Sequence, residues 1–218
     1  MKILVCISSV PDTTSKINFT ADKSAFDKNG IQWVINPYDE FALTKAVKLQ
    51  ESQGATVTIA TVGDAATEAV MRKALAIGAN DAIRVNAEPK DSITVAKELA
   101  KIVEEGGYDL VLCGKDSIDY NGAAVPAMIA QLLNRPFVNA CVGLEVNGAE
   151  ATAVREIEGG KETLSVKLPA VIAGQKGMVE EKDLIIPNMR GIMSARTKPL
   201  TVKDQRKPRL WRPPEPER

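Results

Sequence analysis

Short apolar segments alternate with longer amphipathic ones up to Pro136, and this alternation restricts the fold more than any other feature of the sequence. The short segments are apolar or rich in β-branched residues, and they predict strands at 2–7, 31–36, 55–63, 82–85 and 109–114. The longer ones predict a helix from Asp39 to Gly54, a helix capped by Ser92, and helices within 66–80 and 122–133. Strands and helices that alternate in this way form a parallel sheet with helices on both faces. We therefore predict an α/β fold.

The pattern changes after Pro136. Asn147-Gly148 and Gly159-Gly160 are hairpin signals inside alternating segments, and they predict an antiparallel addition that ends in a strand at 170–174. Toward the C-terminus, proline becomes frequent and apolar periodicity is lost. We assign 1–178 to an α/β domain that includes the hairpin extension, and 201–218 to an extended or disordered tail.

Residue types that are missing or scarce exclude several classes of site. The 218-residue chain has no histidine, which removes Ser-His-Asp and Cys-His catalysis and most zinc sites. Cys6, Cys113 and Cys141 lie in apolar runs and predict buried thiols, not a disulfide framework. Basic and acidic residues number 28 each and aromatic residues make up 4%, which argues against nucleic-acid binding. Because we find no signal segment and no apolar stretch of spanning length, we expect a cytoplasmic protein.

The ends of the predicted parallel strands locate the candidate ligand site. Ligands of such sheets bind at the carboxyl ends of the strands, a rule that selects Ile7–Pro11, Asn36–Glu40, Thr61–Asp64 and Gly114–Gly122. Neither the dinucleotide-binding fingerprint nor the P-loop motif occurs. In GKDSIDYNGAAVPAM (114–128), small residues open a helix, and the free N–H groups there suit a phosphate. The same segment is also compatible with a simple tight connection.

Two further segments leave alternatives open. Asp39 fits a helix cap, or it joins Asn36 in hydrogen-bonding a ligand. Residues 189–196 (MRGIMSAR) combine two methionines and an isoleucine with basic residues. They fit a small core segment or an adaptable docking surface, because methionine repacks easily.

These segments, in this order and with these spacings, resemble the electron-transfer flavoprotein β-subunit family. The resemblance covers about residues 1–200 and runs through ILVCIxxVPD, INPYDEFAL, KALAIGANDAIRV, DLVLCGKDSID, VREIEGGKETL, VKLPAVI and GIMSAR. It implies an adenine-nucleotide-hydrolase-like (Rossmann-like) fold and a heterodimer with a larger α subunit that carries the redox-active FAD. The chain would then be an electron-carrier subunit and not an enzyme, with NADH oxidation only in the electron-bifurcating branch of the family.

The resemblance also implies a buried nucleotide in this chain, either AMP or, in the bifurcating branch, a second FAD. Adenine would lie near Cys6 and Thr61–Gly63, and the phosphate near Asn121–Val125. The full set of implied cofactor-binding residues is Cys6 (through its backbone), Asn36, Asp39, Thr61, Val62, Gly63, Gly114, Asp119, Asn121, Gly122, Ala123, Ala124 and Val125. Many family members have glutamine and glycine where this chain has Ala124 and Pro126, so backbone N–H groups would have to carry more of the phosphate binding.

Partner contacts follow from the same resemblance. It implies that 179–200 is a partner-recognition loop for acyl-CoA dehydrogenases, which act in fatty acid oxidation, or for other flavin dehydrogenases. The family's leucine anchor aligns with Met189, a volume-conserving change, and Ile192, Met193 and Arg196 complete the surface. Glu156 matches an acid near the FAD domain of the α subunit, although a solvated hairpin charge is its alternative. The electron acceptor would be a membrane-bound quinone oxidoreductase or a ferredoxin.

Two other functions compete with this one. A stand-alone adenine-nucleotide-binding regulatory domain of the same fold would need neither the 179–200 loop nor the hairpin at 155–164. A purely structural scaffold would hold no nucleotide at all. Family members usually continue beyond the point where this chain stops, so we expect a naturally short, truncated or frameshifted copy with a less stable heterodimer.

Overall fold

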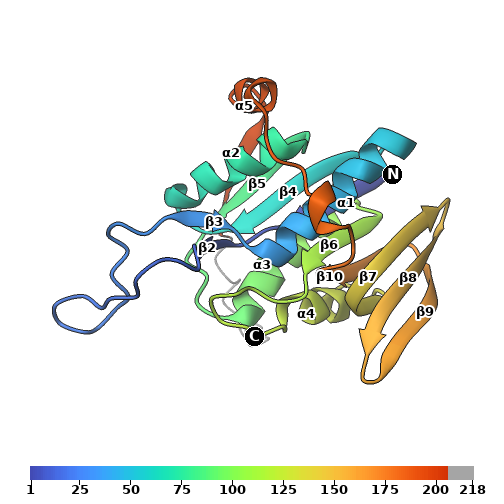
Figure 1. Cartoon of the computed structure of the whole chain (residues 1–218), viewed down its shortest axis with the longest axis horizontal. Coiled ribbons are helices and arrows are strands. Elements are labelled where there is room, and N and C mark those ends of the chain that lie inside the picture. The colour runs from blue at the N-terminus through green and yellow to red at the C-terminus, as the bar shows by residue number, and fades with distance from the viewer. Residues whose placement is uncertain (206–218) are drawn as a thin grey trace, which may run out of the picture.

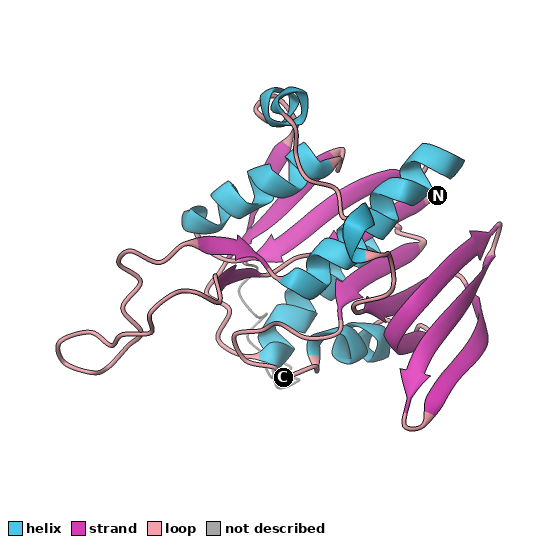
Figure 2. Ribbon diagram, viewed as in Figure 1, coloured by secondary structure: helices cyan, strands magenta, loops and turns pink. Residues whose placement is uncertain are grey.

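A sheet of nine strands runs through residues 1–205, the part of the chain that the computed structural model describes (Figures 1 and 2). In chain order the strands are β1 (Lys2–Cys6), β4 (Thr56–Val62), β5 (Asp81–Asn86), β6 (Leu110–Gly114), β7 (Phe137–Asn147), β8 (Glu150–Ile157), β9 (Gly160–Lys167), β10 (Ala170–Gly174) and β11 (Leu200–Asp204). Across the sheet their order is β11-β5-β4-β1-β6-β10-β7-β8-β9, and the pairs from β11 to β7 are parallel. The predicted α/β fold is confirmed.

The central strand β1 shows why the sequence pattern is continuous and not alternating. It lies between β4 and β6, with Val5 opposite Ile59 on one side and Leu112 on the other. Ile3, Leu4 and Val5 are all fully buried. Because helices cover both faces of the sheet, successive side chains are apolar whichever face they point to.

Helices cover the sheet in pairs. α1 (Pro37–Gln53) and α2 (Glu68–Ile77) pack on one face, and α3 (Ser92–Gly106) and α4 (Val125–Leu132) pack on the other. A short helix, α5 (Met189–Ala195), lies beside α2 (Figure 1). Two single turns, η1 (Ala65–Thr67) and η2 (Glu181–Asp183), complete the helical elements of the described residues. Among these helices none has the length and apolarity that a bilayer crossing requires.

The first helix begins earlier than predicted and ends where predicted. α1 begins at Pro37 and not at Asp39, because proline is pre-organised for the first helical turn and its missing N–H is not needed there. Gly54 follows its last residue with φ at 67°, in the left-handed region that glycine adopts without strain. Gly78 ends α2 in the same position after the helix, as predicted.

The helices on the other face also differ slightly from the prediction. α3 is capped by Asp91, whose carboxylate accepts the Thr94 N–H at 2.7 Å, and Ser92 is the first helical residue. α4 begins at Val125, three residues later than predicted, because Ala123 is held at φ 49°, outside the helical region.

Beyond β7 the sheet becomes antiparallel, as predicted. β7, β8 and β9 pair through turns in which Gly148 and Gly159 have φ of 62° and 82°. β10 then returns to the centre and inserts between β6 and β7, parallel to both. The strand at 170–174 therefore belongs to the parallel part of the sheet and not, as predicted, to the antiparallel addition. This return places the end of β10 beside the end of β6.

The predicted strand at 31–36 does not join the main sheet. Its central residues form β3 (Trp33–Ile35), which pairs antiparallel with β2 (Ser9–Pro11) in a separate two-stranded sheet. The segment between them extends away from the body of the molecule (blue in Figure 1).

The C-terminal assignment needs correction at its start. Residues 200–204 form β11, which pairs in parallel with β5 as an edge strand, so residues 201–204 belong to the sheet and not to a tail. The remainder of the predicted tail, 206–218, lies outside the described residues.

We expect Leu112→Ala to lower the free energy of unfolding by about 2–5 kcal/mol, because the truncation leaves a cavity under α1 in the middle of the sheet. Urea denaturation measures this loss. Val202→Ala in β11 is the control, since its side chain is 46% exposed and should change stability by about 0.5 kcal/mol or less. Equal losses for the two variants would contradict the burial described above.

Candidate functional site

The carboxyl ends of β1 and β4 are joined side by side at the predicted edge. The Ile7 N–H donates to the Ala60 carbonyl at 2.9 Å, and Thr61 Oγ1 donates to the Ile7 carbonyl at 2.8 Å. The Asn36 N–H donates to the Ser8 carbonyl at 2.9 Å, which brings the start of α1 to the same place. Three of the four segments selected from the sequence therefore adjoin one another.

Asp39 connects the fourth segment to them. Its Oδ2 accepts the Ser8 N–H at 2.7 Å and its Oδ1 accepts the Gly114 N–H at 2.8 Å, so one carboxylate joins the ends of β1 and β6. Any Cβ at Gly114 would collide with Asp39 and Tyr38, which explains the glycine. Asp39 lies inside the first turn of α1, after the N-cap Asn36, so the helix-cap alternative was wrong. Its part in binding a nucleotide stays a prediction.

Burial dominates the electrostatics of Asp39. Loss of solvent raises the pKa of its carboxyl to about 7, and the two backbone N–H donors oppose that rise only in part. The charge of Asp119 adds a small further increase.

Asn36 fixes the loop that follows β6. Its side chain is completely buried. Nδ2 donates to the Asp116 carbonyl at 2.8 Å, and Oδ1 accepts the Ile118 N–H at 3.1 Å. Both ends of the amide are therefore used within the protein, and α1 holds the loop without help from a ligand.

The rest of the 114–125 loop is exposed and irregular. Asp119, Asn121, Gly122 and Ala123 are exposed, and Tyr120 is 86% exposed. Asn121 and Ala123 have φ of 50° and 49°, a conformation that costs a non-glycine residue free energy. The predicted small-residue entry to α4 is present, and phosphate binding by it stays a prediction.

Arg84 is a site-supporting residue that the sequence analysis missed. Its guanidinium is buried and donates to the Gly63 carbonyl at 3.0 Å and to Asn86 Oδ1 at 2.9 Å, and it pairs with Glu68 at 3.0 Å. These bonds hold the turn after Val62, where adenine was expected. A charged residue inside the apolar run AIRV was the available signal.

Two of the three cysteines lie under the same edge. Cys6 is the last residue of β1, Cys113 is the next-to-last residue of the neighbouring β6, and both belong to one core cluster on the α3–α4 face. A hydrogen bond with Cys6, and then burial, raise the pKa of the Cys113 thiol, and burial raises that of Cys141. All three thiols are buried, as predicted, and none forms a disulfide.

A polar hollow lies at the ends of β6 and β10. Its volume is about 420 Å³, and its lining residues are Tyr38, Lys115, Glu156, Gln175 and Lys176. Glu156 accepts a hydrogen bond from Gln175 Nε2, and Lys115 Nζ lies 5.3 Å from the centroid of the Tyr38 ring. Glu156 therefore belongs to a polar surface while its side chain remains exposed, and its role near the α subunit stays a prediction.

α5 places the predicted recognition residues on the surface. Met189, Met193 and Ile192 are 74%, 56% and 42% exposed, and Arg196 is also exposed. Asn188 caps the helix by accepting the Gly191 N–H at 2.8 Å. The alternative of a small core segment was wrong for these side chains, while docking stays a prediction.

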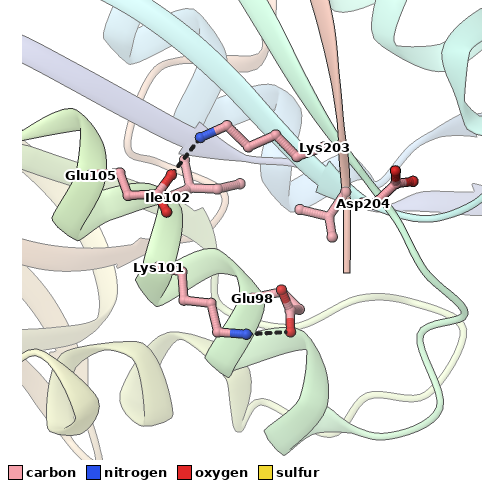
Figure 3. Close-up of a pocket in the computed structure, with 7 residues that line it drawn as sticks. Glu98, Lys101, Ile102, Glu105, Lys203 and Asp204 are labelled. Atoms are coloured by element: carbon pink, nitrogen blue, oxygen red, sulfur yellow. Dashed lines mark hydrogen bonds and ion pairs between the residues drawn. The ribbon is translucent and has the colours of Figure 1, made fainter. Parts of the chain in front are cut away.

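Another hollow, of about 320 Å³, lies between α3 and the end of β11 (Figure 3). Four of its five charged side chains form two ion pairs, Lys101 with Glu98 at 2.7 Å and Lys203 with Glu105 at 2.6 Å. None of the predicted site residues lines it. Within residues 1–205 no cluster of three or more cysteine or carboxylate side chains could hold a metal ion.

The sequence of the chain is similar to those of several known proteins. Residues 24–207 match the family of the electron transfer flavoprotein domain. The chain is 35% identical to the electron transfer flavoprotein subunit beta of Bacillus subtilis (strain 168), over 92% of this chain and 77% of that protein. It is 36% identical to the subunit beta of Syntrophomonas wolfei, over 93% and 79%, and 33% identical to that of Homo sapiens, over 93% and 80%.

We expect Asp39→Asn to remove a pH-dependent part of the stability. The pKa of the Asp39 carboxyl is about 7 in the folded protein and about 4 in the unfolded chain. The contribution of this carboxyl to the free energy of unfolding is therefore fully present below about pH 4 and is lost as the pH rises through 7. Between pH 4 and 8 the parent protein should therefore lose unfolding free energy relative to the variant.

Chemical denaturation at several pH values measures the difference. Glu51→Gln, an exposed change on the same helix, should leave the pH profile of the parent unchanged. A constant offset between the Asp39→Asn variant and the parent across this range would contradict the raised pKa.

Proposed function

This chain belongs to the electron transfer flavoprotein family as a β subunit, and we propose that it holds an adenine nucleotide, pairs with a larger FAD-carrying α subunit and docks flavin dehydrogenases. The FAD of the α subunit would supply the redox chemistry. The nucleotide of this chain would be AMP with a structural function, or a second FAD if the complex bifurcates electrons. The chain would catalyse no bond-making step of its own.

The pre-formed carboxyl edge is the observation that carries the nucleotide proposal. Asp39 and Asn36 fix the ends of β1 and β6 and the following loop through backbone groups. Arg84 fixes the turn after β4 in the same way. A site whose shape is set by the protein can bind a ligand without a large ordering cost, and open α/β sheets bind ligands at this edge.

The base end of the site fits an adenine ring. Cys6 would take part through its backbone, and Val62, which is 8% exposed, adds an apolar side chain beside the turn from Thr61 to Gly63. Hydrogen bonds from Arg84 and to the Val85 carbonyl fix the geometry of this turn. The phosphate end is the segment from Asn121 to Val125, where backbone N–H groups at the start of α4 would take part.

Two surfaces are proposed for partners. The hollow that includes Glu156 would face the flavin-carrying domain of the α subunit, because it combines a carboxylate with Lys115 and Lys176 beside the nucleotide edge. The exposed Met189, Ile192 and Met193, with Arg196, would dock acyl-CoA dehydrogenases or other flavin dehydrogenases. A quinone oxidoreductase or ferredoxin would accept the electrons, and a cytoplasmic location is proposed for the complex.

A stand-alone adenine-nucleotide-binding regulatory domain is the second candidate. The shared nucleotide edge favours it as much as it favours a subunit. The exposed methionines of α5 weigh against it, because a sensor of nucleotide alone gains nothing from an apolar docking helix.

We expect the purified full chain, co-expressed with an α subunit, to give a yellow 1:1 complex that releases a nucleotide on heat denaturation. Chromatography of the released material identifies it. Release of AMP supports a complex in which the nucleotide has a structural function. Release of a second FAD supports a complex that bifurcates electrons. Release of no nucleotide beyond the α-subunit FAD contradicts the assigned site, and two independent monomers contradict the partnership.

We expect Met189→Ala to slow reduction of the complex by an acyl-CoA dehydrogenase by about tenfold, the effect of losing one apolar anchor worth about 1.4 kcal/mol. Stopped-flow absorbance of the flavin measures the rate. Nucleotide content should not change, because α5 is separate from the carboxyl edge. Leu132→Ala, which truncates a 43% exposed side chain on α4, is the control. An unchanged rate for the Met189 variant would remove the docking proposal.

A further inference from the structure

The start of α4 offers a phosphate few hydrogen-bond donors. Positions 123–127 are alanine, alanine, valine, proline and alanine, so no polar side chain is present. Ala124 occupies the N-cap without a side-chain cap bond, and Pro126 in the first turn has no N–H. Only some backbone N–H groups remain, and strong phosphate sites add charged or hydroxyl side chains to these.

The charge of the loop also opposes a phosphate. Segment 114–127 contains one cation, Lys115, and two carboxylates, Asp116 and Asp119. Lys115 lies over the Tyr38 ring and lines the hollow that contains Glu156. A phosphate at the start of α4 would therefore meet a loop of net negative charge, with its single ammonium group engaged elsewhere.

The carboxylate of Asp116 favours a ligand group that donates a hydrogen bond. Its Oδ1 is buried and accepts no hydrogen bond from any residue that the structure describes. Asn36 holds the Asp116 carbonyl, so the residue has a fixed place in the loop. A buried carboxylate oxygen requires a donor. A ribose hydroxyl or an amino group is a donor, whereas a phosphate dianion is an acceptor and would be repelled.

The end of the site at Cys6 and Thr61–Gly63, where a base would lie, is better suited to its part of the ligand than the phosphate end. Val62 leaves a small apolar surface beside the Cys6 backbone, and the backbone of Thr61–Gly63 is held by the Thr61 and Arg84 hydrogen bonds. An apolar surface beside a backbone turn of fixed geometry suits a flat heterocycle such as a purine.

From this contrast we infer that the site binds its ligand through the nucleoside portion, that a 5′-phosphate adds little affinity, and that Asp116 accepts a hydrogen bond from that nucleoside. The inference rests on the proposed nucleotide site. It restricts the ligand class to purine nucleosides and to nucleotides that bind through their nucleoside portion.

Calorimetric titration of the dialysed full chain with adenosine and with AMP tests the inference. We expect the two dissociation constants to agree within about threefold. AMP that binds more than about thirtyfold tighter than adenosine would overturn the inference and leave the proposed function intact. Failure of both ligands to bind would overturn the nucleotide site and the inference with it.

Two variants sharpen the test. Asp116→Asn should weaken adenosine and AMP equally, by about tenfold, while the exposed Glu180→Gln should change neither. The double change Ala124→Gln and Pro126→Gly adds a side-chain donor and a backbone N–H, and it should make AMP at least about tenfold tighter than adenosine. An unchanged affinity in the Asp116 variant, or a double variant without phosphate preference, counts against the inference. Circular dichroism establishes that each variant is folded.

Discussion

The carboxylate of Asp39 is the interaction on which the arrangement of the carboxyl edge depends. It accepts N–H groups from Ser8 and Gly114, and these residues lie at the ends of two neighbouring strands. Backbone groups at strand ends have no partner within the sheet, and a buried N–H without an acceptor is costly. A single side chain from α1 satisfies both. Gly114 is required because any side chain there would occupy the space of the carboxylate. The strand ends, the helix start and the following loop are thus positioned together.

The first turn of α1 links the two polar regions of this edge. Asn36 and Asp39 bond to the loop and the strand end of the candidate nucleotide site, whereas Tyr38 lies in the hollow with Lys115 and Glu156. A shift of this turn would therefore alter the candidate nucleotide site and the proposed α-subunit surface at the same time. The many backbone hydrogen bonds around Asn36 make such a shift unfavourable, so the turn acts as a rigid base for both surfaces.

The parts of the fold that were predicted from sequence are those with a local signal. Burial on both faces gives β1 and β6 their continuous apolar runs, and glycine with a left-handed φ marks both hairpins. The contacts that build the site have no local signal. The bond from Asp39 to Gly114 spans 75 positions, and a carboxylate near a helix start has the sequence signature of a cap. β11 was missed for a similar reason, since its short mixed sequence becomes a strand only by pairing with β5.

The chemistry of the buried thiols argues for where electrons would travel in the proposed complex. A reactive cysteine needs a stabilised thiolate near solvent. Here Cys113 and Cys141 are buried with raised pKa values, and Cys6 is buried beside Cys113. The thiols under the carboxyl edge are therefore packed as apolar side chains and are poorly suited to exchange electrons with a bound flavin. In a β subunit with this interior, electrons would pass through flavins held at its surfaces. The contribution of the chain would be the fixed geometry that Asp39 and Asn36 impose.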